Sequence, residues 1–208
     1  LPYAVFDEPR DSWRADFLKK AGPMVQNVET ASEAAQILNR DFFKRINTHY
    51  NTGRERTNQS PAESIEQGQA TCTGLSIILV DVCRAVGIPA RAVGTPLWHD
   101  KSGNHTWVEI WDDGWHFTGA DEYDSRGLNH GWFSGNAARA DASDSKHAIY
   151  ATSWKKDTLY FPMVWNLKNH SVGADNVTER YRIKNTRIAD TIGVRFFEGD
   201  ARMVKLGE

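Results

Sequence analysis

Two side chains suited to nucleophilic chemistry stand at the starts of two neighbouring elements. Cys72 begins an apolar stretch, and His105 begins a tryptophan-rich one. At the N-terminus of a helix, unpaired N–H groups and the helix dipole favour thiolate over thiol and can also bind an oxyanion. A nearby imidazole accepts the thiol proton, and a carboxylate holds that imidazole in place. Cys72 is therefore a candidate nucleophile and His105 a candidate base, and a third residue is needed as the orienting acid.

The predicted hairpin supplies that acid. Residues 105–111 and 115–120 are predicted to form two antiparallel strands joined by a tight turn, with side chains that alternate between the two faces. A three-residue turn places Asp121 opposite His105, whereas a two-residue turn places Glu122 there. We expect Asp121 to orient the imidazole, with Glu122 as the alternative.

The elements that must position these residues are helices followed by strands. A capping pattern begins the helices at 31–50 and 61–67, and Gly22-Pro23 is expected to end the first helix. The predicted helices span residues 11–21, 31–50, 61–67 and 72–86. The predicted strands cover residues 90–97, the hairpin, two runs within 146–165 around Ile149 and Tyr160, and β-like runs near 178–183 and 191–197. This order predicts an α+β fold, with a mainly antiparallel sheet packed on the helix that carries Cys72.

The length of 208 residues suits one domain with a core of its own. We expect residues 1–170 to form this domain. Residues 171–208 are expected to form a β-rich tail, which either joins the same sheet or begins another module.

Residues 60–121 resemble the core of the transglutaminase-like superfamily of papain-like cysteine enzymes. The resemblance is carried, in order, by Ser60-Pro61-Ala62-Glu63, Cys72 with Gly74 and Leu75, RAVGIPAR at 84–91, HTWVEI at 105–110, and Gly114-Trp115. It implies a papain-like core with Cys72 as nucleophile and His105 as base. It also implies an Asp on the next strand. The family usually has Asp-Pro about four residues after the hairpin tryptophan, where this chain has Gly119-Ala120 before Asp121 and Glu122.

Other residues near the motif are candidates for the substrate cleft. Gln67 and Gln69 lie just before the thiol, where papain-like enzymes use a Gln to help hold the oxyanion. Trp98, Trp107, Trp115 and Trp132 are candidate cleft walls, with sheet core as the alternative for Trp107. Gly74 is expected to keep the approach to the sulfur open.

Charge and composition limit the partners. The net charge is −2 without a long basic run, so we expect no nucleic-acid partner. No apolar run approaches the roughly 20 residues of a membrane span. Cys72 and Cys83 lie too far apart on one helix for a disulfide. The histidines match no zinc pattern, so neither a metal nor another cofactor is expected. A start without Met is compatible with secreted or periplasmic protein whose signal peptide has been removed.

Together these features predict a cysteine-dependent acyl-transfer enzyme acting on a peptide or protein substrate. Hydrolysis of a peptide or amide bond through a thioester is the expected reaction. A protein-glutamine transglutaminase and a non-catalytic binding or scaffold module are the alternatives.

Overall fold

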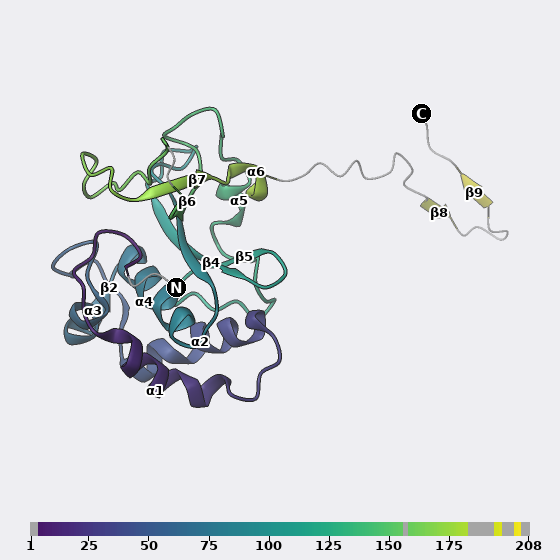
Figure 1. Ribbon diagram of the computed structural model, residues 1–208. Helices are drawn as coiled ribbons and strands as arrows, with labels where there is room; N and C mark the ends of the chain where they lie inside the picture. Colours follow the sequence, from purple (N-terminus) through teal and green to yellow (C-terminus); the bar gives the residue numbers. More distant parts are fainter. Residues whose placement is uncertain (1–3, 156–157, 183–193, 197–201, 205–208) are drawn as a thin grey trace.

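Helices come first along the chain and the main sheet follows, as an α+β fold requires (Figure 1). The structure is a computed structural model that describes residues 4–155, 158–182, 194–196 and 202–204. The helices are α1 Trp13–Val25, α2 Ala31–Ile46, α3 Pro61–Gln67, α4 Cys72–Ala85, α5 Ser134–Ala137 and α6 Thr178–Tyr181. The strands are β1 His49–Tyr50, β2 Gln69–Ala70, β3 Ala90–Thr95, β4 His105–Trp111, β5 Trp115–Thr118, β6 Tyr150–Ser153, β7 Gly173–Asn176, β8 Val194–Phe196 and β9 Arg202–Val204.

The predicted helix starts at residues 31 and 61 are confirmed by their caps. Before α2, the Thr30 hydroxyl accepts the N–H of Glu33 at 3.1 Å. Before α3, Ser60 and Glu63 form a reciprocal capping box, in which each side chain accepts the backbone N–H of the other. Such caps satisfy N–H groups that have no partner within the helix.

The predicted end of the first helix is wrong. α1 continues through Gly22 and Pro23 to Val25. Pro23 lies in the last turn, so its missing N–H removes one hydrogen bond close to the helix end. Phe17 and Ala21 on the same helix are buried in the core, and this burial favours the helical path.

α2 ends at Ile46 rather than at residue 50. Asn47 adopts a left-handed backbone with φ of 49°, a conformation that ends helices and that Asn tolerates. His49 and Tyr50 then form β1, which pairs in parallel with β2 directly before α4.

The main sheet has the strand order β5-β4-β3-β6-β7, and all its pairs are antiparallel. Trp111 pairs with Trp115, which confirms the register of the three-residue turn. Residues beyond 170 contribute to this sheet through β7. Two predicted strands are wrong: Tyr160 makes only an isolated bridge to Gly173, and residues 178–181 form α6.

The two faces of the sheet pack against different partners. One face lies on α4, with α1 and α2 on the same side (Figure 1). Its buried residues include Ala90, Ala92, Val108, Ile110 and Tyr150. The opposite face holds an aromatic cluster that α5 and α6 flank, and its buried members include Val93, Trp98, Trp107, Phe133 and Tyr181. The predicted sheet on the Cys72 helix is therefore present, and a second small core lies behind it.

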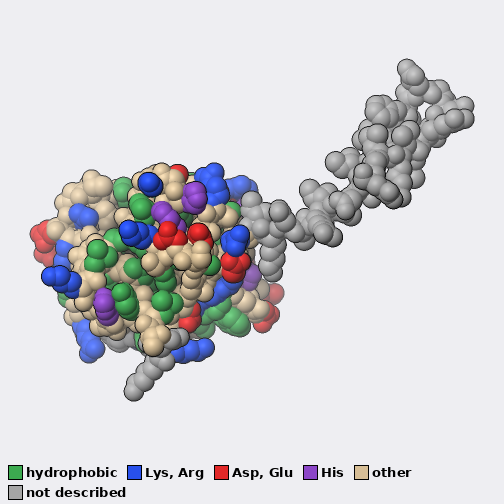
Figure 2. Space-filling view, turned by 90° about the horizontal axis from the view of Figure 1, so that it is seen from above, with side chains coloured by type: hydrophobic (Ala, Val, Ile, Leu, Met, Phe, Trp, Pro, Cys, Tyr) green, Lys and Arg blue, Asp and Glu red, His purple; other side chains and the backbone are tan. Residues whose placement is uncertain are grey.

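Acidic and basic side chains are interspersed on the face in Figure 2, in keeping with the net charge of −2. Among the described residues, every helix is too short or too polar to cross a lipid bilayer.

Candidate active site

Cys72 is the first residue of α4, as predicted. Thr71 occupies the N-cap position, but its side chain does not cap the helix. The Thr71 hydroxyl instead faces Arg54, whose Nε lies 3.4 Å away. The N–H groups of the first turn of α4 therefore lack a side-chain cap, unlike those of α2 and α3.

Gly74 serves packing rather than access to the sulfur. A Cβ at this position would lie 2.8 Å from the Cβ of Ala70 and 3.4 Å from the hydroxyl of Ser64. The glycine thus allows the first turn of α4 to pack closely on β2 and α3. That Gly74 also keeps the approach to the thiol open stays a prediction.

The Cys72 thiol lies at the edge of β4. The backbone N–H of Thr106, the residue after His105, donates to it, and Thr73 contributes further hydrogen bonds. A bond between the hydroxyls of Thr73 and Thr106, 3.3 Å apart, fastens the start of α4 to the same strand. Burial raises the pKa of the thiol, and these hydrogen bonds only partly oppose it. The predicted lowering of the pKa is therefore wrong for this closed site, since desolvation outweighs the helix terminus.

His105 is the first residue of β4 and is only 5% exposed. Its imidazole lies among aromatic rings, with centroids 4.9 Å from Trp132, 4.8 Å from Phe133 and 5.7 Å from Trp107. Burial lowers the pKa of His105 to about 4. The imidazole is consequently neutral at neutral pH, and its Nε2 has no hydrogen-bond partner among the described residues.

Glu122, rather than Asp121, approaches the imidazole. Its Oε2 lies 4.0 Å from Nε2 of His105, whereas the Asp121 carboxylate lies 3.0 Å from Nδ1 of His49. The pairing of β4 with β5 extends only to Val108 and Thr118, so residue 121 is not part of the ladder. The register is correct, but projecting it to residue 121 fails because the strand ends first.

A tight turn after β5 brings Glu122 into place. The Glu122 N–H donates to the carbonyl of Gly119 at 3.3 Å, and Asp121 adopts a left-handed backbone with φ of 61°. The N–H of Asp121 donates to the buried Asn39 side chain at 2.8 Å, which fixes the turn. A Cβ on Gly119 would lie 2.7 Å from Cδ of Glu122, so the folded-back side chain requires glycine there.

Trp132 completes the site. Its indole N–H donates to Oε2 of Glu122 at 2.9 Å, and its ring packs beside His105 while remaining 66% exposed. Burial raises the pKa of the Glu122 carboxyl, and the bond from Trp132 opposes this shift. The tryptophan thus covers the imidazole and also holds the carboxylate.

The other candidates from the sequence occupy different places. Trp98 and Trp107 are buried and stack on each other with centroids 5.8 Å apart, next to His105. Trp115 lies at the opposite end of the hairpin, where it stacks with the guanidinium of Arg91 at 3.8 Å. Trp98 and Trp107 therefore pack beside the imidazole as part of the buried aromatic cluster, whereas Trp115 lies away from it.

The two glutamines before the thiol bind the preceding loop. Gln67 Oε1 accepts the N–H of Glu55 at 3.1 Å, and Gln69 Nε2 donates to the carbonyl of Gly53 at 3.0 Å. These bonds tie both side chains to the loop at residues 53–55.

Cys83 lies in the core, and burial raises the pKa of its thiol to about 12. Both cysteines are free, as the spacing predicted. Within the described ranges, no three His, Cys, Asp or Glu side chains are grouped closely enough to hold a metal ion.

Comparison with known proteins identifies the family of this region. Residues 19–121 match the family model of the transglutaminase-like superfamily. This part of the chain, from α1 to the turn after β5, therefore belongs to the transglutaminase-like superfamily. No curated protein matches the chain.

Several solved structures show a distant likeness. A putative cysteine protease from Cytophaga hutchinsonii is 19% identical, with a TM-score of 0.44 over 55% of this chain and 40% of that one. A putative protease from Parabacteroides distasonis is 14% identical, with a TM-score of 0.40 over 68% of this chain and 26% of that one. A structure described as a TGase is 16% identical, with a TM-score of 0.36 over 54% and 32%. The chain thus matches less than half the length of each.

Proposed function

We propose that this protein is a cysteine-dependent acyl-transfer enzyme that hydrolyses peptide or amide bonds through a thioester on Cys72. The observation that carries the proposal is that Cys72 and Glu122 both lie next to the start of β4, the strand that His105 begins. The thiol receives the N–H of Thr106, directly after His105, and the Glu122 carboxylate lies 4.0 Å from the imidazole. We infer that Cys72, His105 and Glu122 act there as the nucleophile, the base and the orienting acid.

The resting charge states place the transfer of the thiol proton within the attack step. Burial raises the pKa of Cys72 and lowers that of His105 to about 4, so the resting pair is a neutral thiol beside a neutral imidazole. As the sulfur bonds to the carbonyl carbon, His105 takes the thiol proton. The nearby Glu122 carboxylate stabilises the imidazolium formed in this step.

The remaining steps return every group to its starting state. His105 gives its proton to the leaving amine when the tetrahedral intermediate collapses to the thioester. Water then attacks the thioester, again with His105 as base, and releases the carboxylic acid and the thiol. The uncapped N–H groups at the start of α4, including that of Cys72, are the proposed donors to the oxyanion. Gln67 and Gln69 are not needed for this role.

The activity is tested by incubating the protein with a mixed peptide library, with and without a labelled primary amine. We expect cleaved peptides from wild type and from Cys83→Ala, which removes the other thiol of the same helix. Cys72→Ala and His105→Gln should lose at least about a hundredfold in rate, as a missing nucleophile or base requires.

Two other results point to the alternatives. Amine-labelled glutamines without cleavage would identify a transglutaminase. A folded wild type that neither cleaves nor labels any peptide would favour a binding or scaffold module, and would contradict the proposed enzyme.

A further inference from the structure

Arg54 places a positive charge beside the first turn of α4. Its Nε lies 3.4 Å from the hydroxyl of Thr71, the residue before Cys72. Its Nη2 donates to the hydroxyl of Thr57 at 3.1 Å, and Nη1 lies 3.5 Å from the carbonyl of Thr52. All three acceptors are neutral oxygens. Among the residues that the structure describes, no acidic side chain pairs with this guanidinium.

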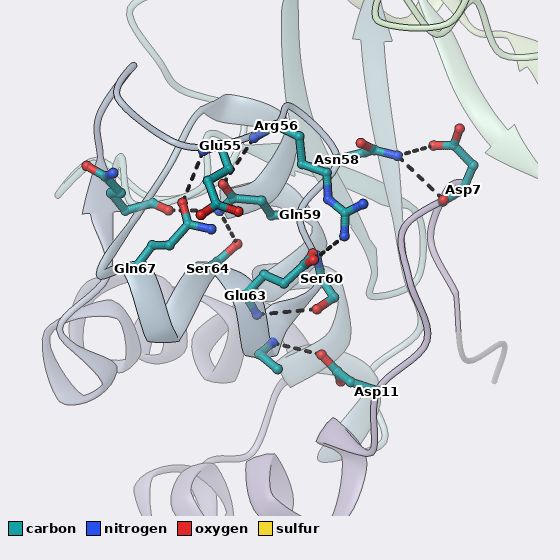
Figure 3. A network of polar contacts seen from close by, with 12 residues as sticks. Asp7, Asp11, Glu55, Arg56, Asn58, Gln59, Ser60, Glu63, Ser64 and Gln67 are labelled. Carbon is teal, nitrogen blue, oxygen red and sulfur yellow. Dashed lines mark hydrogen bonds and ion pairs between the residues drawn. The ribbon is translucent and has the colours of Figure 1, made fainter.

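The loop that carries Arg54 is held on both sides of the arginine, and on the preceding side Gln69 Nε2 donates to the carbonyl of Gly53 at 3.0 Å. Glu55 donates its N–H to Gln67 of α3, and Asn58 donates to the carboxylate of Asp7 at 2.9 Å (Figure 3). Figure 3 also shows Arg56 paired with Glu63 on the same stretch. The charge of the neighbouring Arg56 is therefore neutralised within the protein. The geometry of Arg54 is preorganised, because the loop is fixed before any ligand arrives.

A guanidinium presents a planar fork of N–H donors that suits a carboxylate, and such charge-assisted bonds are stronger than bonds to neutral oxygens. Arg54 uses three contacts to neutral acceptors and lacks this better partner. Within the part of the chain that the structure describes, the carboxylate that faces His105 is that of Glu122. Glu122 would repel a second carboxylate, so a substrate that carries one needs a nearby cation.

We propose that Arg54 binds a carboxylate of the substrate, so that the enzyme prefers an amide bond flanked by an acidic residue. This inference rests on the proposed function. Thr71 touches Arg54 and adjoins Cys72, and an extended peptide advances roughly 3.3–3.6 Å per residue. The recognised carboxylate therefore belongs to the residue that contributes the attacked carbonyl or to one of its immediate neighbours. Arg54 is a specificity residue, and the bond-breaking steps do not use it.

Two small alkylating reagents test this without knowledge of the substrate. Iodoacetate carries a carboxylate, whereas iodoacetamide is its neutral counterpart, and the same thiolate attacks either reagent and displaces iodide. The ratio of their rates at Cys72, measured by mass spectrometry at one pH, is therefore independent of the thiol pKa. We expect Arg54→Gln to lower the iodoacetate-to-iodoacetamide ratio roughly two- to fivefold, as the loss of one partly exposed charge pair implies. Arg54→Lys should retain part of the preference.

The possible outcomes distinguish a failure of this inference from a failure of the proposed function. An equal ratio in wild type, Arg54→Gln and Arg54→Lys, all folded by circular dichroism, overturns the inference and leaves the proposed function standing. A Cys72 that reacts with neither reagent, even at a pH high enough to ionise a thiol of raised pKa, overturns both. In the peptide library, wild type should favour cleavage next to Asp or Glu, and Arg54→Gln should raise KM for these peptides with little change in kcat. Cleavage by wild type without such a preference also overturns the inference.

Discussion

The buried imidazole of His105 makes a quantitative prediction about stability. Its folded-state pKa of about 4 lies below the ordinary value of 6.5, because burial disfavours the charged ring. The unfolded chain therefore binds this proton more readily, and stability is lost as pH falls from 6.5 towards 4. Linkage between these two pKa values gives a loss of about 2 kcal/mol at pH 5 and about 3 kcal/mol at pH 4.

The assay compares urea unfolding of wild type and His105→Gln at pH 7, 5 and 4. Taking the difference between the two proteins at each pH removes the contribution of the other titrating groups. We expect this difference to shift in favour of His105→Gln by about 2 kcal/mol from pH 7 to 5, and by a further ~1 kcal/mol at pH 4. His99→Gln, at an exposed position, controls for the loss of an imidazole. A difference that stays constant across this range would refute the desolvated, neutral His105.

Two further substitutions test the group that orients the imidazole. Gly119→Ala should displace the Glu122 side chain, because the new Cβ would lie 2.7 Å from Cδ of Glu122. We expect kcat to fall roughly tenfold. The control is Gly135→Ala, which has open space around the new Cβ and should leave activity unchanged. Equal activities of these two variants would remove Glu122 from the account. Trp132→Phe keeps an aromatic ring beside His105 but removes the hydrogen bond that lowers the pKa of Glu122. The acid limb of the plot of kcat against pH should therefore move to higher pH. An unchanged acid limb would mean that the Glu122 carboxylate does not titrate in catalysis.

Local signals in the sequence were sufficient for the parts of the fold that depend on near neighbours. The caps at Thr30 and Ser60 involve residues three positions apart, so the pattern carries the whole interaction. The hairpin register likewise follows from a short turn between two alternating strands. The position of Cys72 at the start of α4 belongs to the same class of local prediction.

The acid of the site depended on contacts that the sequence pattern does not encode. Asn39, far away in α2, binds the turn after β5 and helps to direct Asp121 away from the imidazole. The one local hint was Gly119, because a glycine at a strand end often permits close approach of another group. Trp132 was recognised as a candidate cleft residue, but its bond to Glu122 depends on the path of the intervening loop.

The direction of the pKa shift at Cys72 could not be predicted either. The position at a helix N-terminus favours the thiolate, but the degree of burial decides the outcome, and burial is a property of the assembled fold. The same argument applies to His105, whose low pKa arises from aromatic neighbours contributed by separate segments.

The most direct test of the account is the detection of an acyl group on Cys72. Wild type is mixed with the peptide library, quenched in acid, and measured by intact and peptide-level mass spectrometry before and after hydroxylamine treatment. The account predicts a hydroxylamine-sensitive adduct on Cys72 that is strongly reduced in His105→Gln and absent from Cys83. Peptide cleavage that continues in Cys72→Ala, without an adduct on the wild-type thiol, would contradict it.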